Sequence, residues 1–99
     1  MMRVLLHEEA IRDVREIVEQ LSEDSAKAVE QFYDEFEAAA KLVSQRPGAG
    51  HPCGGFRRWD FKRFPFHLLY EAFPATGELW IMVVRHDRRH PSYGTKRRL

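Results

Sequence analysis

The sequence predicts an α+β domain in which a short N-terminal strand and a helical hairpin pack on a C-terminal antiparallel sheet. Apolar residues recur every three or four positions between residues 11 and 45, which is the period of a helix. From residue 57 onward they alternate or run together, as in strands. A chain of 99 residues has room for one hydrophobic core, so we expect residues 1–99 to form one domain.

The first half of the chain is predicted to hold a strand and two helices. Residues 3–7 are a short apolar run, typical of a strand. Residues 11–21 carry an apolar stripe, with charged residues between its members, that suits an amphipathic helix of about four turns. Ser22–Ser25 interrupt this stripe and offer N-caps for a second helix, which continues to about Gln45.

The second half is predicted to be a three-stranded meander. Residues 47–55 contain two prolines and four glycines and are expected to form one long irregular loop. Strands are expected at 57–63, 66–73 and 79–85, joined by short turns. The helical hairpin would cover one face of this sheet and leave the other open. The basic segment 86–99 is expected to be irregular.

The formal net charge of +1 conceals two halves of opposite sign. Residues 1–45 carry five Lys/Arg against eleven Asp/Glu, a net charge of −6. Residues 46–99 carry eleven Lys/Arg against four Asp/Glu, a net charge of +7. An imbalance of this size indicates that the basic half binds a partner, whereas the acidic residues suit a solvated helix face.

Several classes of protein are excluded. The single Cys53 cannot form a disulfide within the chain. Glu8 and Glu9 follow the first apolar run too closely for a signal peptide, and no run approaches the roughly 18 residues of a membrane span. We therefore expect a cytoplasmic protein without a membrane partner.

The five histidines do not form a recognisable metal site. His51 with Cys53, and His86 with His90, are the only close pairs, and neither has a third ligand at a familiar spacing. Nucleotide-binding and nucleophile motifs are also missing. The prediction is therefore no metal and no cofactor.

Basic residues gather on the predicted meander and behind it, interleaved with Trp59, His67 and Tyr93. Such a face suits RNA, through phosphate pairing and base stacking, and suits an acidic protein or peptide equally well. A solvated sheet face is the remaining alternative. The cations expected to bind the partner are Arg57, Arg58, Lys62, Arg63, Arg85, Arg88 and Arg89.

Four features in this order resemble the RelE/ParE superfamily of bacterial toxins, the toxin halves of type II toxin–antitoxin modules. The resemblance spans residues 3–95 and implies a helical hairpin on an antiparallel sheet, as predicted above. The features are Ala10, Asp13 and Ile17 on the first helix, Pro47-Gly48 after the second, Phe64-Pro65-Phe66-x-x-x-Tyr70, and H-x-R-R-x-P-x-Y from His86 to Tyr93.

RelE-like members of this superfamily are ribosome-dependent endonucleases of messenger RNA. Their metal-free chemistry needs a base, an acid and cations around the reacting phosphate. Aligning the Phe66-x-x-x-Tyr70 segment places Asp60 and Asp87 where that branch has cations, so the match is incomplete. The residues that the resemblance implies for a nuclease are Arg58, His67, Arg88, Arg89 and Tyr93. Among them His67 is a candidate acid or base because an unperturbed histidine titrates near neutrality.

ParE-like members inhibit DNA gyrase by binding, without chemistry of their own. The Arg-Arg-x-Pro-x-Tyr ending and the Phe-Pro-Phe segment resemble this branch more closely. The resemblance thus implies a growth-inhibiting toxin of a plasmid stabilisation system, neutralised by a cognate antitoxin and directed at gyrase. A nuclease acting on ribosome-bound messenger RNA and a non-toxic antitoxin-binding module are the alternatives. The resemblance is compatible with a homodimer or with a toxin–antitoxin hetero-oligomer.

Arg88, Arg89 and Tyr93 also have a structural interpretation. Tyr93 would pack the tail on the sheet, and the two arginines would pair with the acidic helices.

Overall fold

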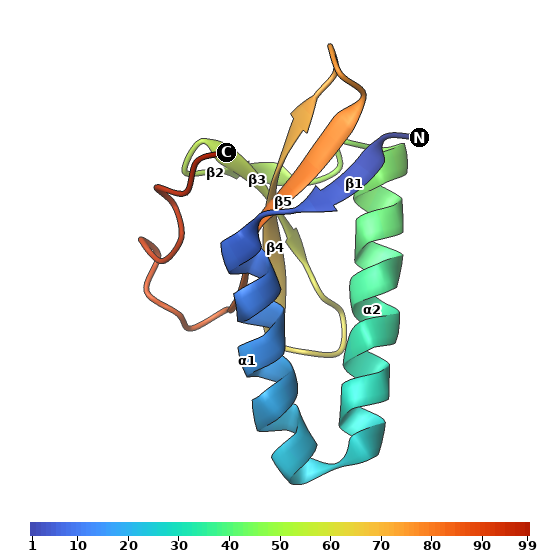
Figure 1. Cartoon of the computed structure of the whole chain (residues 1–99), viewed down its shortest axis with the longest axis vertical. Helices are drawn as coiled ribbons and strands as arrows, with labels where there is room; N and C mark the ends of the chain where they lie inside the picture. Colours follow the sequence, from blue (N-terminus) through green and yellow to red (C-terminus); the bar gives the residue numbers. More distant parts are fainter.

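Two helices form an antiparallel hairpin against one face of a five-stranded sheet in the computed structural model, which describes residues 1–99 (Figure 1). Helix α1 spans Glu8–Asp24 and α2 spans Ala26–Gln45. Ser25 separates them, and its side chain accepts a hydrogen bond from the Ala28 N–H at 3.0 Å, as expected of an N-cap. Neither helix is long and apolar enough to cross a membrane.

The C-terminal strands form the predicted antiparallel sheet, and the N-terminal strand adds to it in parallel, so that the whole sheet is mixed. Its strands are β1 (Arg3–Leu6), β2 (His51–Cys53), β3 (Phe56–Asp60), β4 (Phe66–Phe73) and β5 (Glu78–His86), in the order β1-β5-β4-β3-β2. Strands β2 to β5 form the antiparallel part, and β1 pairs with β5 in parallel. Val4 and Leu6 of β1 pack on the helix-covered core, and β1 forms the edge of the sheet beside β5.

The segment 47–55, expected to be an irregular loop, contains β2. Gly54 and Gly55 both have positive φ angles, 55° and 86°, so they form a two-residue hairpin turn between β2 and β3. Cys53 and Phe56 flank this turn and pack against a small cluster formed by Leu69, Met82 and Val83. Two of the four glycines that suggested a loop are therefore the turn of a hairpin, whereas residues 47–50 form an irregular connection as predicted.

The main core lies between the helices and the sheet. Phe32 of α2 is fully buried at its centre, with its ring centroid 5.7 Å from Phe61 and 5.6 Å from Phe66. Ala10 and Ile17 of α1 face the same core. This arrangement confirms the predicted apolar stripe of α2 and that of α1 from Val14 onward, whereas Ile11, at the start of the predicted α1 stripe, is 45% exposed.

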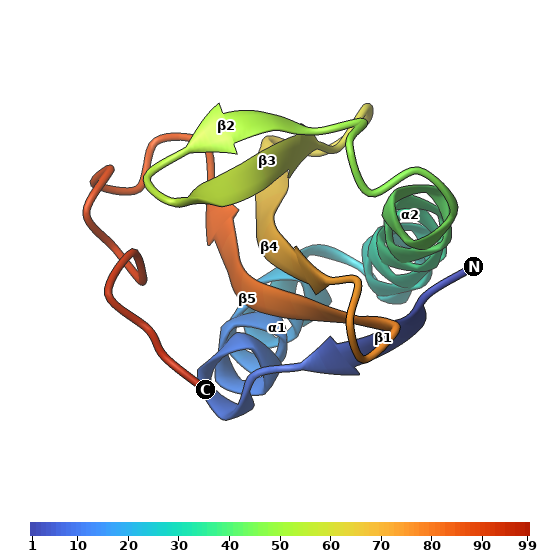
Figure 2. The same cartoon turned by 90° about the horizontal axis from the view of Figure 1, so that it is seen from above.

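The second face of the sheet was predicted to be open, but part of the tail covers it. After β5 the chain has no helix or strand and passes along the side of β4 and β5 that lies away from α2 (Figure 2). Tyr93 packs on the cluster of Leu69, Met82 and Val83. Gly94 lies so close to Val83 that a Cβ at residue 94 would come within 2.6 Å of the Val83 Cγ2.

Polar side chains, not another strand, cap the edge of β5 beyond the end of β1. The pairing of β1 with β5 ends at Leu6 and Ile81. Past that point the Asp13 carboxylate accepts a hydrogen bond from the Val84 N–H at 3.0 Å, and the Arg97 guanidinium donates to the Met82 carbonyl at 2.9 Å. Free backbone groups of the edge are thereby satisfied without a neighbouring strand.

Asp13 and Arg97 also form a buried ion pair. Their closest atoms, Oδ2 and Nη1, are 2.6 Å apart, and only 3% and 8% of the two side chains are exposed. Burial lowers the pKa of Arg97, but the hydrogen bonds and the charge of Asp13 outweigh it and raise this pKa above its ordinary value. The pair joins α1 to the tail across 84 residues of sequence.

We expect Asp13→Asn to lower the free energy of unfolding by about 3–5 kcal/mol, because it leaves the Arg97 charge buried without its partner. The matched control is Glu9→Gln, which removes a more exposed carboxylate 3.4 Å from the same guanidinium. That control should cost about 1 kcal/mol or less. Urea unfolding followed by tryptophan fluorescence measures both effects, and equal losses in the two variants would contradict the role given to Asp13.

Candidate functional site

A row of polar residues crosses three strands on the tail-covered face of the sheet. Asp60 of β3 pairs with His67 of β4, which pairs with Arg85 of β5. His67 is 1% exposed and Arg85 is 5% exposed. These residues share the face of Leu69 and Val83, because residues two apart on a strand point the same way.

His67 is held by hydrogen bonds at both ring nitrogens. The Arg85 Nε–H donates to Nε2 at 2.8 Å, and because a guanidinium only donates, Nε2 carries no proton. The proton lies on Nδ1, which donates to the Asp87 carboxylate at 2.8 Å. Burial lowers the pKa of His67 below its ordinary value of 6.5, the hydrogen bond to Asp87 opposes this, and the charges of Arg58 and Arg85 lower it further. The ring is therefore neutral at physiological pH.

Arg58 neutralises the carboxylates around His67. Its Nε donates to Asp60 at 2.9 Å, and its Nη2 lies 2.8 Å from Asp60 and 3.6 Å from Asp87. Asp60, His67 and Asp87 could each offer one ligand atom to a metal ion, within 4.8 Å of one another. The Arg58 guanidinium already supplies the positive charge there, and the Nδ1 proton occupies the donor position of His67.

Arg85 connects this row to the tail. Besides the bond to His67, its Nη1 donates to the carbonyls of Pro91 at 2.9 Å and Tyr93 at 2.8 Å. Burial lowers the pKa of Arg85 from its ordinary value, and the neighbouring Cys53 partly offsets this. Arg85 thus binds the tail backbone at Pro91 and Tyr93 to the sheet.

Tyr93 and Arg89 form a second group, on the α1 side of the tail. The Tyr93 hydroxyl donates to the Asp13 carboxylate at 2.8 Å, and the Arg89 guanidinium lies 3.9 Å from the centre of the Tyr93 ring. Burial, together with the hydrogen bond to Asp13 and its charge, raises the pKa of Tyr93. The tyrosine therefore packs the tail, as its structural interpretation predicts, but neither Arg88 nor Arg89 pairs with an acidic residue of the helices.

The structure divides the five residues predicted for a nuclease. Arg58 and His67 lie together around Asp87, whereas Arg89 and Tyr93 lie together beside Asp13. The exposed Arg88 side chain contacts neither group through a hydrogen bond or ion pair. Arg58 and His67 are held in place by Asp60, Asp87 and Arg85. No spacing in the sequence indicated that these residues would lie together.

The cations predicted to bind a partner also fall into two sets. Arg58 and Arg85 are engaged within the protein. The side chains of Lys62, Arg63, Arg88 and Arg89 are exposed and form no ion pair. Lys62 and Arg63 lie near Arg88 and Arg89, because the two segments meet where the Asp87 N–H donates to the Pro65 carbonyl at 2.8 Å. Arg57 is exposed as well, and its Nη1 donates to the Gly50 carbonyl at 2.6 Å.

Asp13 and Arg97 were not among the predicted site residues. Asp13 lies between Ala10 and Ile17 on the buried face of α1, and a carboxylate on an apolar stripe was the signal that it needs a buried partner. Nothing in the sequence identified Arg97 as that partner among the basic residues of the tail. Only the folded tail brings them together.

The lowered pKa of His67 means that the contribution of this residue to stability falls as the pH decreases through about 6.5. Unfolded His67 binds a proton below about pH 6.5, while the folded ring stays neutral until a lower pH, so the unfolded state binds more protons and gains stability. This histidine contributes a slope of up to about 1.4 kcal/mol per pH unit. Urea unfolding of the protein and of His67→Gln should show a smaller slope in the variant. The exposed His51→Gln should keep the slope of the original protein, and an unchanged slope in His67→Gln would contradict the prediction.

The match to known families covers most of the fold. A family model described as the ParE toxin of type II toxin–antitoxin system, parDE, matches residues 4–91. These residues include both helices and all of the sheet except the first residue of β1, and they end before Tyr93 and Arg97. No curated protein matches the chain. The chain belongs to the ParE toxin family of type II toxin–antitoxin systems.

Proposed function

We propose that this ParE-family toxin inhibits DNA gyrase in the cytoplasm by binding alone, and that a cognate antitoxin neutralises it. The family match supports a toxin with an antitoxin partner. As part of such a module, the toxin would serve in plasmid stabilisation. Binding rather than catalysis is favoured by the state of the acid–base groups in the folded protein.

One observation carries this proposal: the side chains that would transfer protons are already engaged with other protein groups. The Nε2 of His67 accepts from Arg85, its Nδ1 donates to Asp87, and the Tyr93 hydroxyl donates to Asp13. A general acid or base must reach a proton of the substrate. Both groups would have to break internal bonds first, whereas binding requires no such change.

The exposed cations offer a surface for an acidic partner. Lys62 and Arg63 lie on the turn between β3 and β4, which Glu35 of α2 holds through the backbone N–H groups of both residues. Arg88 and Arg89 lie beside this turn, just after β5. Four unpaired cations on segments that the fold holds in place favour association with negatively charged groups.

The antitoxin would use the same charge. An extended or helical antitoxin segment would cover this basic surface and the groove beside the helices, with its acidic residues paired to the exposed arginines. Occupation of the cations by the antitoxin would then exclude the target.

The second candidate is a RelE-like nuclease, and the contact of Arg58 and His67 with Asp87 is the observation in its favour. A cation beside a histidine could act on a phosphodiester if the tail moved away. The third candidate, a non-toxic antitoxin-binding module, predicts neither inhibition nor cleavage.

Two assays of the purified protein, without its antitoxin, distinguish these candidates. We expect inhibition of gyrase supercoiling, gyrase-dependent DNA breaks and intact ribosome-bound messenger RNA. Cleavage of that RNA with normal supercoiling would overturn the proposal in favour of the nuclease. Normal results in both assays, with expression harmless to growing cells, would point to the non-toxic module.

Charge-reversal variants test the surface. Arg88→Glu with Arg89→Glu should weaken inhibition at least about tenfold, because like charges then face the acidic partner. Lys27→Glu with Lys41→Glu changes the net charge equally on exposed positions of α2 and should leave inhibition within about twofold. Equal effects of the two double variants would show that net charge, not this surface, governs binding.

A further inference from the structure

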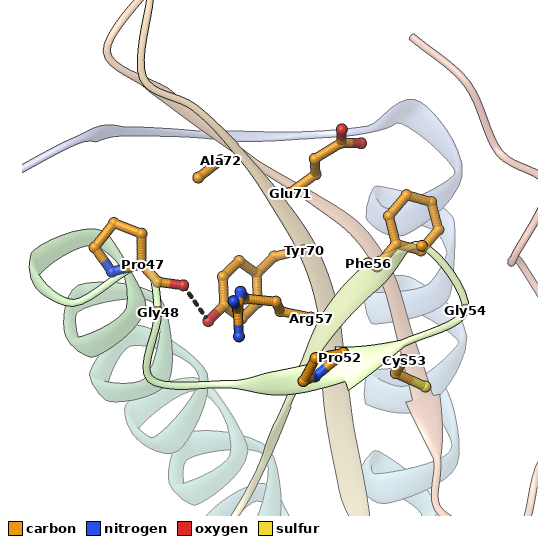
Figure 3. Close-up of a pocket in the computed structure, with 11 residues that line it drawn as sticks. Pro47, Gly48, Pro52, Cys53, Gly54, Phe56, Arg57, Tyr70, Glu71 and Ala72 are labelled. Atoms are coloured by element: carbon orange, nitrogen blue, oxygen red, sulfur yellow. Dashed lines mark hydrogen bonds between the residues drawn. The ribbon is translucent and has the colours of Figure 1, made fainter.

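An open cavity of about 630 Å³ lies at the end of the sheet that bears the β2–β3 hairpin (Figure 3). Its walls come from the loop after α2, from this hairpin and from residues 70–72 of β4. Tyr70 ties the loop to the sheet, since its hydroxyl donates to the Pro47 carbonyl at 2.8 Å and accepts from the Gly50 N–H at 2.9 Å. The cavity is thus bounded by fixed elements, and neither His67 nor Arg85 lines it.

One wall of the cavity is a length of strand that lacks a neighbour. The pairing of β3 with β4 ends at Arg57 and Tyr70, whereas β4 continues to Phe73 along β5. The Phe61 N–H donates to the Phe66 carbonyl, so residues 66, 68, 70 and 72 direct their backbone groups toward β3. Beyond the end of β3 the N–H and the carbonyl of Ala72 therefore face the cavity, and no hydrogen bond joins them to the hairpin turn.

The cavity carries two opposite charges that do not neutralise each other. Arg57 is anchored through Nη1 to the Gly50 carbonyl at 2.6 Å, which leaves Nε and Nη2 for another acceptor. Glu71 is half-buried and forms no hydrogen bond or ion pair through its carboxylate. Arg57 is paired with Tyr70 on the helix-covered face, while Glu71 is paired with Trp80 on the other face.

The outer edge of β2 is a poorer place for an added strand. Cys53 and Phe56 flank a two-residue turn and face each other, so Pro52 directs its backbone outward. Proline has no N–H to donate. This edge is therefore blunted, whereas the edge at Ala72 keeps both its donor and its acceptor.

We propose that this cavity binds an extended peptide segment of a partner protein, which continues the line of β3 along β4. The peptide pairs its backbone with Ala72, as in strand addition to a sheet edge. The residue opposite Ala72 lies on the face of Arg57 and is acidic, and its neighbour lies on the face of Glu71 and is basic. Neither the family match, which concerns the fold and the toxin class, nor the proposed gyrase surface assigns this site.

A titration of the isotope-labelled full chain by NMR tests the proposal. The probe is the tetrapeptide N-acetyl-Ala-Asp-Lys-Ala-amide, for which we expect a Kd on the order of 1 mM, given its size. Saturable shifts are expected at the backbone amides of Ala72, Gly54 and Gly55. The neutral N-acetyl-Ala-Asn-Gln-Ala-amide should bind at least about fivefold more weakly, because it lacks both charges.

Variants distinguish the site from general attraction to a basic protein. Arg57→Gln should weaken binding of the charged probe at least about fivefold, whereas Arg88→Gln, which removes the same charge elsewhere, should not. Ala72→Pro removes the N–H that faces the cavity and leaves the bonds to β5, so binding should be lost. The spectrum of each variant, away from residues 47–57, reports whether it has folded. No shift at Ala72, or equal effects of Arg57→Gln and Arg88→Gln, would overturn the proposal.

Discussion

The second half of the structure depends on the hydrogen bonds and the ion pair that the buried carboxylate of Asp13 forms. It accepts hydrogen bonds from the Val84 N–H, the Tyr93 hydroxyl and two nitrogens of Arg97. A buried charge with this many donors is stable only while all of them remain in place. One residue of α1 therefore holds the edge of β5 and the tail together, although the three partners lie 71 to 84 residues away.

Once the tail is held there, the row of His67 and Arg85 becomes an internal network. Arg85 donates a hydrogen bond from Nε to His67 and donates from Nη1 to two tail carbonyls, so the tail and the row stabilise each other. The imidazole is neutral and faces protein atoms on both sides. A position with the composition of an acid–base site thus works as a structural connector, and the proposal of binding rather than catalysis rests on this observation.

The fold explains how the cations behind the net charge of +1 are distributed between paired and unpaired positions. Cations within the structure have protein partners: Arg58 pairs with Asp60 and Arg97 with Asp13, while Arg85 donates to His67 and to two tail carbonyls. Those on the β3–β4 turn and after β5 have no acidic partner. Burial accounts for the partners of the first set, because a charge without hydrogen-bonding or charged partners costs much free energy away from water. The second set is exposed, and these are the cations proposed to bind an acidic partner. The cavity at Arg57 extends this division, since its cation and the Glu71 carboxylate also remain free to bind a partner.

The sequence by itself determined the helices, the order of the three meander strands and the α+β class, because apolar periodicity is a local property that burial enforces. The first of these strands was predicted at 57–63 but ends at Asp60, because Glu35 binds the backbone N–H groups of Lys62 and Arg63 in the turn to β4. The run beginning at Phe66 also gave the limits of β4, and Ser22–Ser25 offered the N-cap candidates from which the structure selects Ser25 for α2. Only the tertiary structure decided the parallel place of β1, the tail on the second face and the partner of Asp13. These depend on contacts between distant segments, and such contacts are set by which polar groups can be satisfied together when the whole chain is packed.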